Sequence, residues 1–176
     1  GAHRQTETLR LTPADSGTAT CPITYAAYPG ERPVISGGAV LGAWQRDDGA
    51  RKSPAGPGKL WWASVPKLAD GAAWRFNQLF VDGHRRTRAR IPAKGQFLRT
   101  DGPISKNHRN GLFFHPGDLR PWTALEEAIV VVYHSWETSI HHIRALDADT
   151  NMVALREPAP WPMGRWARQH RYYVEN

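Results

Sequence analysis

The stretch 23–38, ITYAAYPGERPVISGG, constrains the fold more than any other part of the chain. Two short apolar runs, 23–28 and 33–36, flank a Pro-Gly pair that signals a tight turn. Their Ile, Thr, Tyr and Val residues favour extended backbone. A strand, a turn and a second strand with no helix between them is the pattern expected of one coil of a parallel β-solenoid.

Composition places the chain among ordinary globular proteins. It has 176 residues, of which 40% are hydrophobic and 22% are charged. The 16 Gly and 14 Pro stand at turn-like places, which favours a β-rich chain with frequent corners. The longest apolar run, 128–133, is far too short to cross a bilayer, so no membrane partner is expected. Cys21, the one cysteine, is expected to be a buried, inert thiol.

Charge and tryptophan content suggest possible partners. The formal net charge is +7, which favours an anionic partner such as nucleic acid, acidic polysaccharide or a wall polymer. A basic surface with no such partner is the alternative. The eight Trp residues suit cores, interfaces and sugar-stacking platforms alike, and most are expected in a core.

The pattern along the chain predicts four regions. Residues 1–45 form one or two coils, 46–59 an exposed loop, 60–156 an antiparallel β-domain, and 157–176 a connection that begins to return to the solenoid. A solenoid normally needs three or more repeats, so the middle region is expected to form its own barrel or sandwich.

The middle region contains the clearest strand signals. Asp82-Gly83 indicates a type I′ hairpin between 75–82 and a continuous return strand over 84–91. The most apolar strand is expected at 129–136, and two further strands at 140–147 and 152–156.

Several ordered landmarks carry a resemblance to a known family. They are Leu9-Arg10-Leu11, the stretch 23–38, the LFVDG segment 79–83 leading to 87–92, Trp136 followed by Ile143, and the closing YVEN, 173–176. Together they resemble the N-terminal part of right-handed parallel β-helix proteins of the pectate-lyase-like superfamily, specifically glycoside hydrolases with an inserted β-domain.

The resemblance implies an all-β fold with one or two right-handed parallel β-helix coils plus an antiparallel insert. It also implies a bacterial, secreted or periplasmic parent that acts on polysaccharide, whose later coils carry the catalytic carboxylates. This piece is then structural or substrate-contacting and not catalytic by itself. A non-catalytic carbohydrate-binding module is the first alternative, and a basic nucleic-acid-binding domain is the second and less favoured one.

Arg86, Arg88 and Arg90 alternate, so a strand would place all three on one face, where guanidinium groups can bind anions. The alternatives are structural bracing of nearby loops, a glycan contact and a nucleic-acid contact. Nucleic-acid readers usually interleave exposed aromatic side chains with basic ones, and none stands between His84 and Pro92. Trp136 joins these arginines as a candidate substrate contact.

The acidic and histidine-rich segments offer weaker candidates. Asp147 and Asp149 could serve as paired carboxylates for sugar hydrolysis, although 147–151 also has the composition of a turn between strands. His134, Glu137, His141 and His142 have the residue types of a metal site, but the zincin pattern needs helical spacing and this segment reads as strand. No metal and no cofactor is therefore expected.

Overall fold

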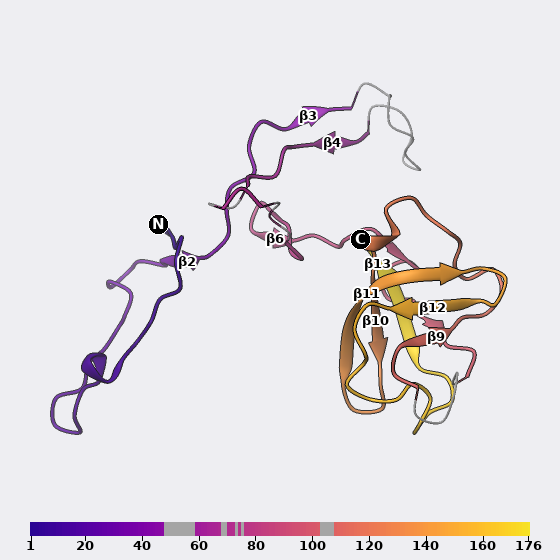
Figure 1. The fold of residues 1–176 in the computed structure, drawn as a ribbon. Helices are drawn as coiled ribbons and strands as arrows, with labels where there is room; N and C mark the ends of the chain where they lie inside the picture. The colour runs from indigo at the N-terminus through magenta and orange to yellow at the C-terminus, as the bar shows by residue number, and fades with distance from the viewer. Residues whose placement is uncertain (48–58, 68–69, 73, 75, 103–107) are drawn as a thin grey trace. The chain divides into compact units, whose positions relative to one another are not determined.

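The computed structural model describes residues 1–47, 59–67, 70–72, 74, 76–102 and 108–176 (Figure 1). The chain divides into two compact units, Gly1–Arg75 and Phe76–Asn176. The described residues of both units form strands, turns and two short 3-10 helices, and none of them lies in an α-helix. The prediction of an all-β protein is therefore confirmed. None of the described helical segments is long and apolar enough to cross a membrane.

The first unit contains a parallel strand pair. β1 (Ala2–Arg4) pairs with β2 (Val34–Ser36), with His3 opposite Ile35. Parallel strands need a long crossover, which is usually an α-helix. Here the crossover contains only the 3-10 helix η1 (Pro13–Asp15). The expected second strand of the 23–38 pattern is thus present as β2, but residues 23–28, the expected first strand, are not part of a strand.

A second, antiparallel pair completes the described strands of this unit. β3 (Gln45–Arg46) pairs with β4 (Trp61–Trp62). Large apolar side chains of the unit face solvent, among them Tyr25 at 71% exposed and Ile35 at 69%. Cys21 is also exposed, so the prediction of a buried thiol is wrong. The described residues before Phe76 contribute no hydrophobic side chain to the buried core.

The second unit is built on a seven-stranded sheet. Its strands run in the order β7-β13-β10-β11-β12-β9, and β8 also pairs with β13. Their bounds are β7 (Arg90–Ile91), β8 (Leu98–Arg99), β9 (Gly111–Phe113), β10 (Ile129–Tyr133), β11 (Thr138–Asp147), β12 (Met152–Leu155) and β13 (Arg171–Glu175). All pairings within it are antiparallel. A short hairpin, β5 (Phe80–Val81) with β6 (His84–Arg85), precedes the sheet.

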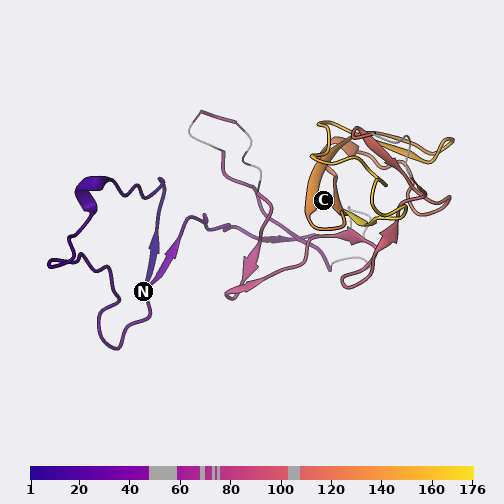
Figure 2. The ribbon, with the colours of Figure 1, turned by 90° about the horizontal axis from the view of Figure 1, so that it is seen from below.

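The sheet curls on itself without forming a closed barrel in the part that the structure describes (Figure 2). A single bridge joins Thr100, directly after β8, to Phe114, directly after β9. Every described pairing of this sheet is antiparallel, and the sheet extends to β13 (Arg171–Glu175), beyond the expected range 60–156. A continuous parallel β-helix is not part of the described structure, which has one parallel pair.

The core of the second unit is built largely on its central strands. β11 alternates exposed and buried residues from Thr138 to Ile143, as a strand with one face in a core does. β10 is buried along most of its length, because it lies between β11 and β13. Fully buried side chains include Leu112, Val130, Val132, Ile143, Val153 and Tyr172. The short 3-10 helix η2 (Leu125–Glu127) precedes β10.

The tryptophans are placed differently from the prediction. None of the eight belongs to the buried core, and Trp44, Trp61, Trp136, Trp161 and Trp166 are exposed. The expectation that most of them lie in a core is therefore wrong. The core is filled instead by aliphatic side chains with Phe114, Met163 and Tyr172.

Candidate functional site

The three candidate arginines do not lie on one continuous strand. β6 ends at Arg85 and β7 begins at Arg90, and residues 86–89 between them have no strand structure. Alternation places side chains on a common face only along unbroken strand. The predicted return strand over 84–91 is therefore wrong in its middle, and the alternation argument for a common face of Arg86, Arg88 and Arg90 does not apply.

All three guanidinium groups have partners within the second unit. Arg88 Nη1 lies 3.5 Å from Glu175 Oε1 and donates to Asn77 Oδ1 at 3.1 Å. Only 20% of the Arg88 side chain and 17% of the Glu175 side chain are exposed. Arg86, in contrast, is exposed and donates to the carbonyl oxygen of Val81 at 3.2 Å. Arg88 thus links the start of the second unit to β13.

Arg90 makes the densest set of contacts of the three. Its Nε donates to the carbonyl oxygen of Pro92 and its Nη2 to that of Gln96, both at 2.8 Å. The guanidinium carbon lies 3.6 Å from the centre of the Tyr173 ring and 5.7 Å from that of Phe97. These are the contacts that the bracing alternative predicts for an arginine beside a loop.

The two candidate carboxylates, Asp147 and Asp149, lie at the turn between β11 and β12. Asp147 Oδ1 accepts from the backbone N–H groups of Asp149 and Thr150, at 2.9 and 3.2 Å, and Oδ2 accepts from Thr150 Oγ1 at 2.6 Å. These hydrogen bonds lower the pKa of the Asp147 carboxyl below its ordinary value. Both aspartates are exposed. The arrangement is that of a side chain capping a turn, the alternative to a carboxylate pair.

A groove of about 370 Å³ lies beside β7, η2 and the end of β13. Its lining is mainly apolar, with Trp122, Leu125 and Val174, and includes the side chains of Arg90 and Glu175. Glu175 is the only Asp or Glu side chain in that lining, and it faces Arg88. Glycoside hydrolysis normally uses two carboxyl groups about 5–10 Å apart. The groove therefore lacks the usual pair.

Trp136 lies in an exposed aromatic group that the sequence did not reveal. Its ring centroid is 5.2 Å from that of Trp161 and 4.2 Å from that of Trp166, and the latter two are 5.8 Å apart. We call these three residues the tryptophan cluster. Their exposed fractions are 53% for Trp136, 36% for Trp161 and 45% for Trp166. Arg165 stands beside them, with its guanidinium carbon 4.8 Å from the Trp166 ring centre.

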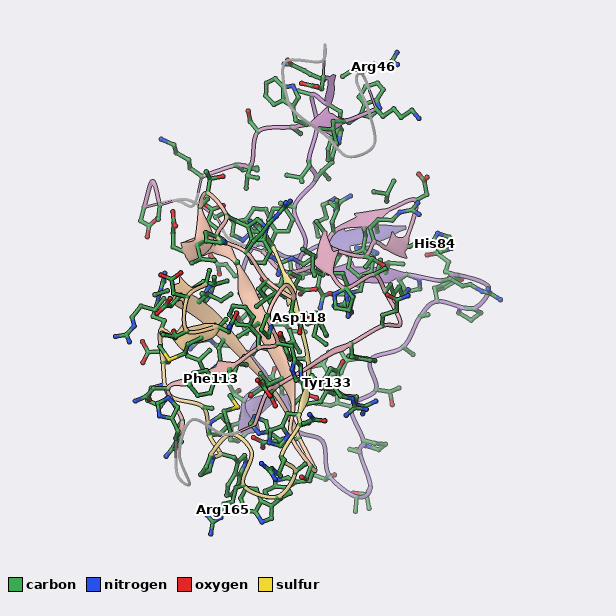
Figure 3. The ribbon with its side chains drawn as sticks, turned by 90° about the vertical axis from the view of Figure 1, so that its right-hand side faces the viewer. Arg46, His84, Phe113, Asp118, Tyr133 and Arg165 are labelled. Atoms are coloured by element: carbon green, nitrogen blue, oxygen red, sulfur yellow. The ribbon has the colours of Figure 1, made fainter. Side chains whose placement is uncertain are left out.

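Two chain segments build this cluster. Trp136 is in the turn between β10 and β11, where the backbone N–H of His134 donates to the carbonyl oxygen of Glu137 at 2.8 Å. Trp161 and Trp166 belong to the loop between β12 and β13. That loop is held by the backbone N–H of Met163, which donates to the carbonyl oxygen of His108, and Met163 itself is buried. Figure 3 labels Arg165, whose side chain projects outward.

Polar side chains are buried next to the same turn. His134 Nε2 and His141 Nε2 lie 2.7 and 2.8 Å from Ser139 Oγ. The rings of His134 and His170 have centroids 5.1 Å apart. We call His134, Ser139, His141 and His170 the histidine cluster. A hydroxyl donates one hydrogen bond, so Ser139 can donate to only one of the two imidazole rings. It accepts a hydrogen bond from the other ring when that ring carries its proton on Nε2.

Burial sets the charge of this cluster. Each of its four side chains is at most 7% exposed. Burial lowers the pKa of His134, His141 and His170, and the neighbouring His170 lowers that of His134 further. Glu137 acts on His134 in the opposite direction. The neutral imidazole is therefore the favoured form of all three.

The histidine cluster differs from the metal site considered from the sequence. His142 is exposed, on the opposite face of β11 from His141, while His170 joins from a distant segment. No group of three or more His, Cys, Asp or Glu residues in the described ranges could hold a metal ion. Within those ranges, His134 Nδ1, Glu137 Oε1 and His170 Nε2 are buried without a hydrogen-bond partner.

Reasoning from the sequence missed Trp161, Arg165, Trp166 and His170 as members of a site. One signal could have indicated the tryptophans, since both lie in or beside a segment rich in Pro, 157–164, where a core strand is not expected. Nothing in the sequence placed that segment next to the turn around Trp136.

Comparison with known proteins gives one fold-level match. A solved structure described as "Glycoside hydrolase" is similar to this chain with a TM-score of 0.69 and 24% sequence identity. The similarity covers 100% of this chain and 30% of the other one, so this chain spans less than a third of its length. No protein-family model and no curated protein sequence matches the chain. The chain therefore has a glycoside hydrolase-like fold.

Proposed function

We propose that this chain is the N-terminal portion of a bacterial, secreted or periplasmic glycoside hydrolase of the right-handed parallel β-helix type that acts on polysaccharide. The observation that carries the proposal is the structural similarity to a glycoside hydrolase over the whole of this chain. Because a fold can support several activities, the residues of this chain must supply the rest of the argument.

The first unit supports the β-helix part of the proposal. Its parallel pair, β1 with β2, is joined by a crossover without an α-helix, as in a coil of a solenoid. Apolar side chains such as Tyr25, Tyr28 and Ile35 are exposed to solvent. A solenoid coil buries its apolar face only when neighbouring coils stack on it. Further coils of the parent protein would cover these side chains.

The contacts of the candidate carboxylates support a structural or substrate-contacting role for this portion rather than a catalytic one. The Asp147 carboxylate is engaged in the turn that it caps, and Glu175 faces Arg88. A general acid or a nucleophile must reach the scissile bond together with a second carboxylate. We infer that the catalytic carboxylates belong to later coils of the parent, and that this portion is structural or contacts substrate.

A carbohydrate-binding module is the second candidate, and the exposed tryptophan cluster favours it. Such a module would bind an extended polysaccharide on a flat row of rings. The rings of the cluster are inclined at 70–76° to one another, so they do not form such a row. A nucleic-acid-binding domain receives less support, since Arg88 and Arg90 make intramolecular contacts.

Two proteins test the proposal: the 176-residue chain and a longer one that continues through the following coils of its parent. Both are assayed for release of reducing sugar from a panel of plant and bacterial polysaccharides. We expect turnover by the longer protein alone. Asp147→Asn in the longer protein is the control and should leave its turnover unchanged. Turnover by the 176-residue chain that Asp147→Asn abolishes would contradict the proposal, as would inactivity of the longer protein on every substrate.

A further inference from the structure

We propose that the tryptophan cluster and Arg165 form a binding site for one carboxylate-bearing sugar residue of an oligosaccharide. The inference rests on the proposed function, because it assigns the substrate contact to named residues of the second unit. Four side chains make up the site: Trp136, Trp161, Arg165 and Trp166.

The geometry of the rings determines what the site can hold. Every pair of rings is close to perpendicular, with interplanar angles of 75°, 70° and 76°. Such rings form a corner, whereas a long polysaccharide needs a flat platform of coplanar rings. A corner contacts a single pyranose ring from two sides. The affinity should therefore change little when the oligosaccharide grows beyond about three residues, because added residues meet no further ring of the cluster.

The exposed rings are held in place by buried neighbours, which reduces the entropy lost on binding. Trp136 lies two residues after the buried His134, whose Nε2 is 2.7 Å from Ser139 Oγ. Trp161 precedes the buried residues Pro162 and Met163. The contact between the His134 and His170 rings joins the turn that carries Trp136 to the segment directly before β13. Both parts of the cluster are thus fixed to the same core.

Arg165 gives the site its charge. Its guanidinium group lies over the Trp166 ring and is not within 4.0 Å of a carboxylate of any described residue. Stacking on a ring leaves the N–H groups at the edge of the guanidinium plane free to bind a carboxylate in bidentate fashion. The formal net charge of +7 favours an acidic partner over a neutral one.

Single-stranded nucleic acid is the other anionic class that combines aromatic and basic contacts. Its recognition uses successive bases that stack on aromatic faces along a basic groove. The cluster instead gathers three rings within 5.8 Å of one another at one place. This geometry suits one sugar residue better than a run of stacked bases.

Binding is measured with the 176-residue chain by tryptophan fluorescence and by calorimetry. The probes are tri- and pentagalacturonate, the neutral cellotriose and cellopentaose, and a single-stranded DNA of ten thymidines. We expect trigalacturonate and pentagalacturonate to bind with similar affinity and cellotriose more weakly. Trp136→Ala should weaken trigalacturonate binding about tenfold. Arg165→Gln should remove the preference for the acidic over the neutral trisaccharide.

Matched variants control for unspecific effects. Trp61→Ala removes a tryptophan outside the cluster that is 60% exposed, against 53% for Trp136. Arg144→Gln removes an exposed arginine outside the cluster. Both variants should bind as the unmodified chain does. Trp136→Phe keeps a ring and should retain most of the affinity if the ring is what binds. A cooperative thermal unfolding transition checks that each variant is folded.

Several results would overturn the inference. They are equal affinity for the acidic and neutral trisaccharides, unchanged binding by folded Trp136→Ala, preferential binding of the DNA, and absence of binding to any probe. The proposed function is tested separately by turnover of the longer protein. If that protein hydrolyses polysaccharide while the cluster variants bind normally, the assignment of this site fails and the proposed function stands.

Discussion

The guanidinium carbon of Arg90 lies 3.6 Å from the centre of the Tyr173 ring, so the first strand of the sheet and its neighbour β13 are joined by a side-chain contact as well as by their ladder. The same guanidinium donates to the carbonyl oxygens of Pro92 and Gln96. It thereby connects β7, the following loop and β13 at one point.

Arg90→Lys should lower the free energy of unfolding by about 1–3 kcal/mol. The lysine keeps the charge but cannot donate to two diverging carbonyl oxygens while it stacks on a ring. Urea denaturation of the two proteins measures the difference. Arg86→Lys is the control, because Arg86 is exposed and makes one carbonyl contact with its side chain, so its effect should stay below about 0.5 kcal/mol. Equal effects of the two substitutions would contradict the bracing role.

Gly111→Ala should destabilise the second unit by about 1–3 kcal/mol. Gly111 is buried in β9, opposite Ala154 of β12, and a Cβ added there would overlap the carbonyl oxygen of Val153. The neighbouring atom is backbone in a ladder and cannot move aside easily. Thermal denaturation followed at the β-sheet circular dichroism signal measures the loss.

The control for this substitution is Gly37→Ala, at a position where an added Cβ meets no atom within 4 Å. It should leave the melting temperature of the second unit unchanged. A Gly111→Ala protein that melts at the same temperature as the unmodified chain would show that β9 and β12 can separate at no cost.

The stability of the second unit should fall as the pH is lowered through about 6.5, the ordinary pKa of histidine. Burial depresses the pKa of His134, His141 and His170 in the folded chain. At about pH 6.5 the unfolded chain therefore binds protons that the folded chain does not. The contribution of these neutral histidines to stability is full above the pKa of histidine in the unfolded chain, and it is lost as the pH falls below that value. The slope is at most about 1.4 kcal/mol per pH unit for each histidine that stays neutral.

Melting temperatures between pH 8 and about pH 5.5, above the range in which ordinary carboxylates titrate, test this expectation. His141→Gln should flatten the slope, because glutamine places an amide near Ser139 and does not titrate. His142→Gln removes an exposed histidine of the same strand and is the matched control. Identical slopes in the two variants would exclude the histidine cluster as the cause.

Local sequence signals predicted the second unit better than the first. Asp82 and Gly83 both have positive φ, 53° and 73°, as a type I′ hairpin requires, and they join β5 to β6 as expected. The strands expected around 129–136, 140–147 and 152–156 are present as β10, β11 and β12. The apolar side chains of β10 and β12 face a core, so periodicity and burial agree there. In β11 they agree only in part, because Ser139 and His141 are buried and Ile140 is 64% exposed.

The prediction of one strand over 84–91 was wrong because the alternation of residue types does not reveal where backbone pairing stops. Arg88 turns instead to partners that lie 11 and 87 residues away, Asn77 and Glu175. In the first unit, the spacing of apolar residues does not correspond to a buried face, since residues such as Tyr28 and Ile35 are exposed. The landmark Leu9-Arg10-Leu11 is likewise exposed and lies outside any strand.

The candidate site shows the same limit. Trp136 was predicted to contact substrate, and that role remains a prediction. Its neighbours Trp161 and Trp166 come from a loop 25 and 30 residues further along the chain. Only the pairing of β10 with both β11 and β13 brings that loop beside the turn after Tyr133. A single sequence gives no direct record of such long-range pairing.

The position of β13 has a consequence for synthesis of the protein. This strand contains residues 171–175, yet it lies inside the sheet, where it pairs with β10, β7 and β8. As the ribosome makes the chain from its N-terminal end, β7, β8 and β10 emerge long before their shared partner. The sheet cannot be completed during that interval, and β10, its most apolar strand, stays unpaired along one edge until residue 175 has left the exit tunnel.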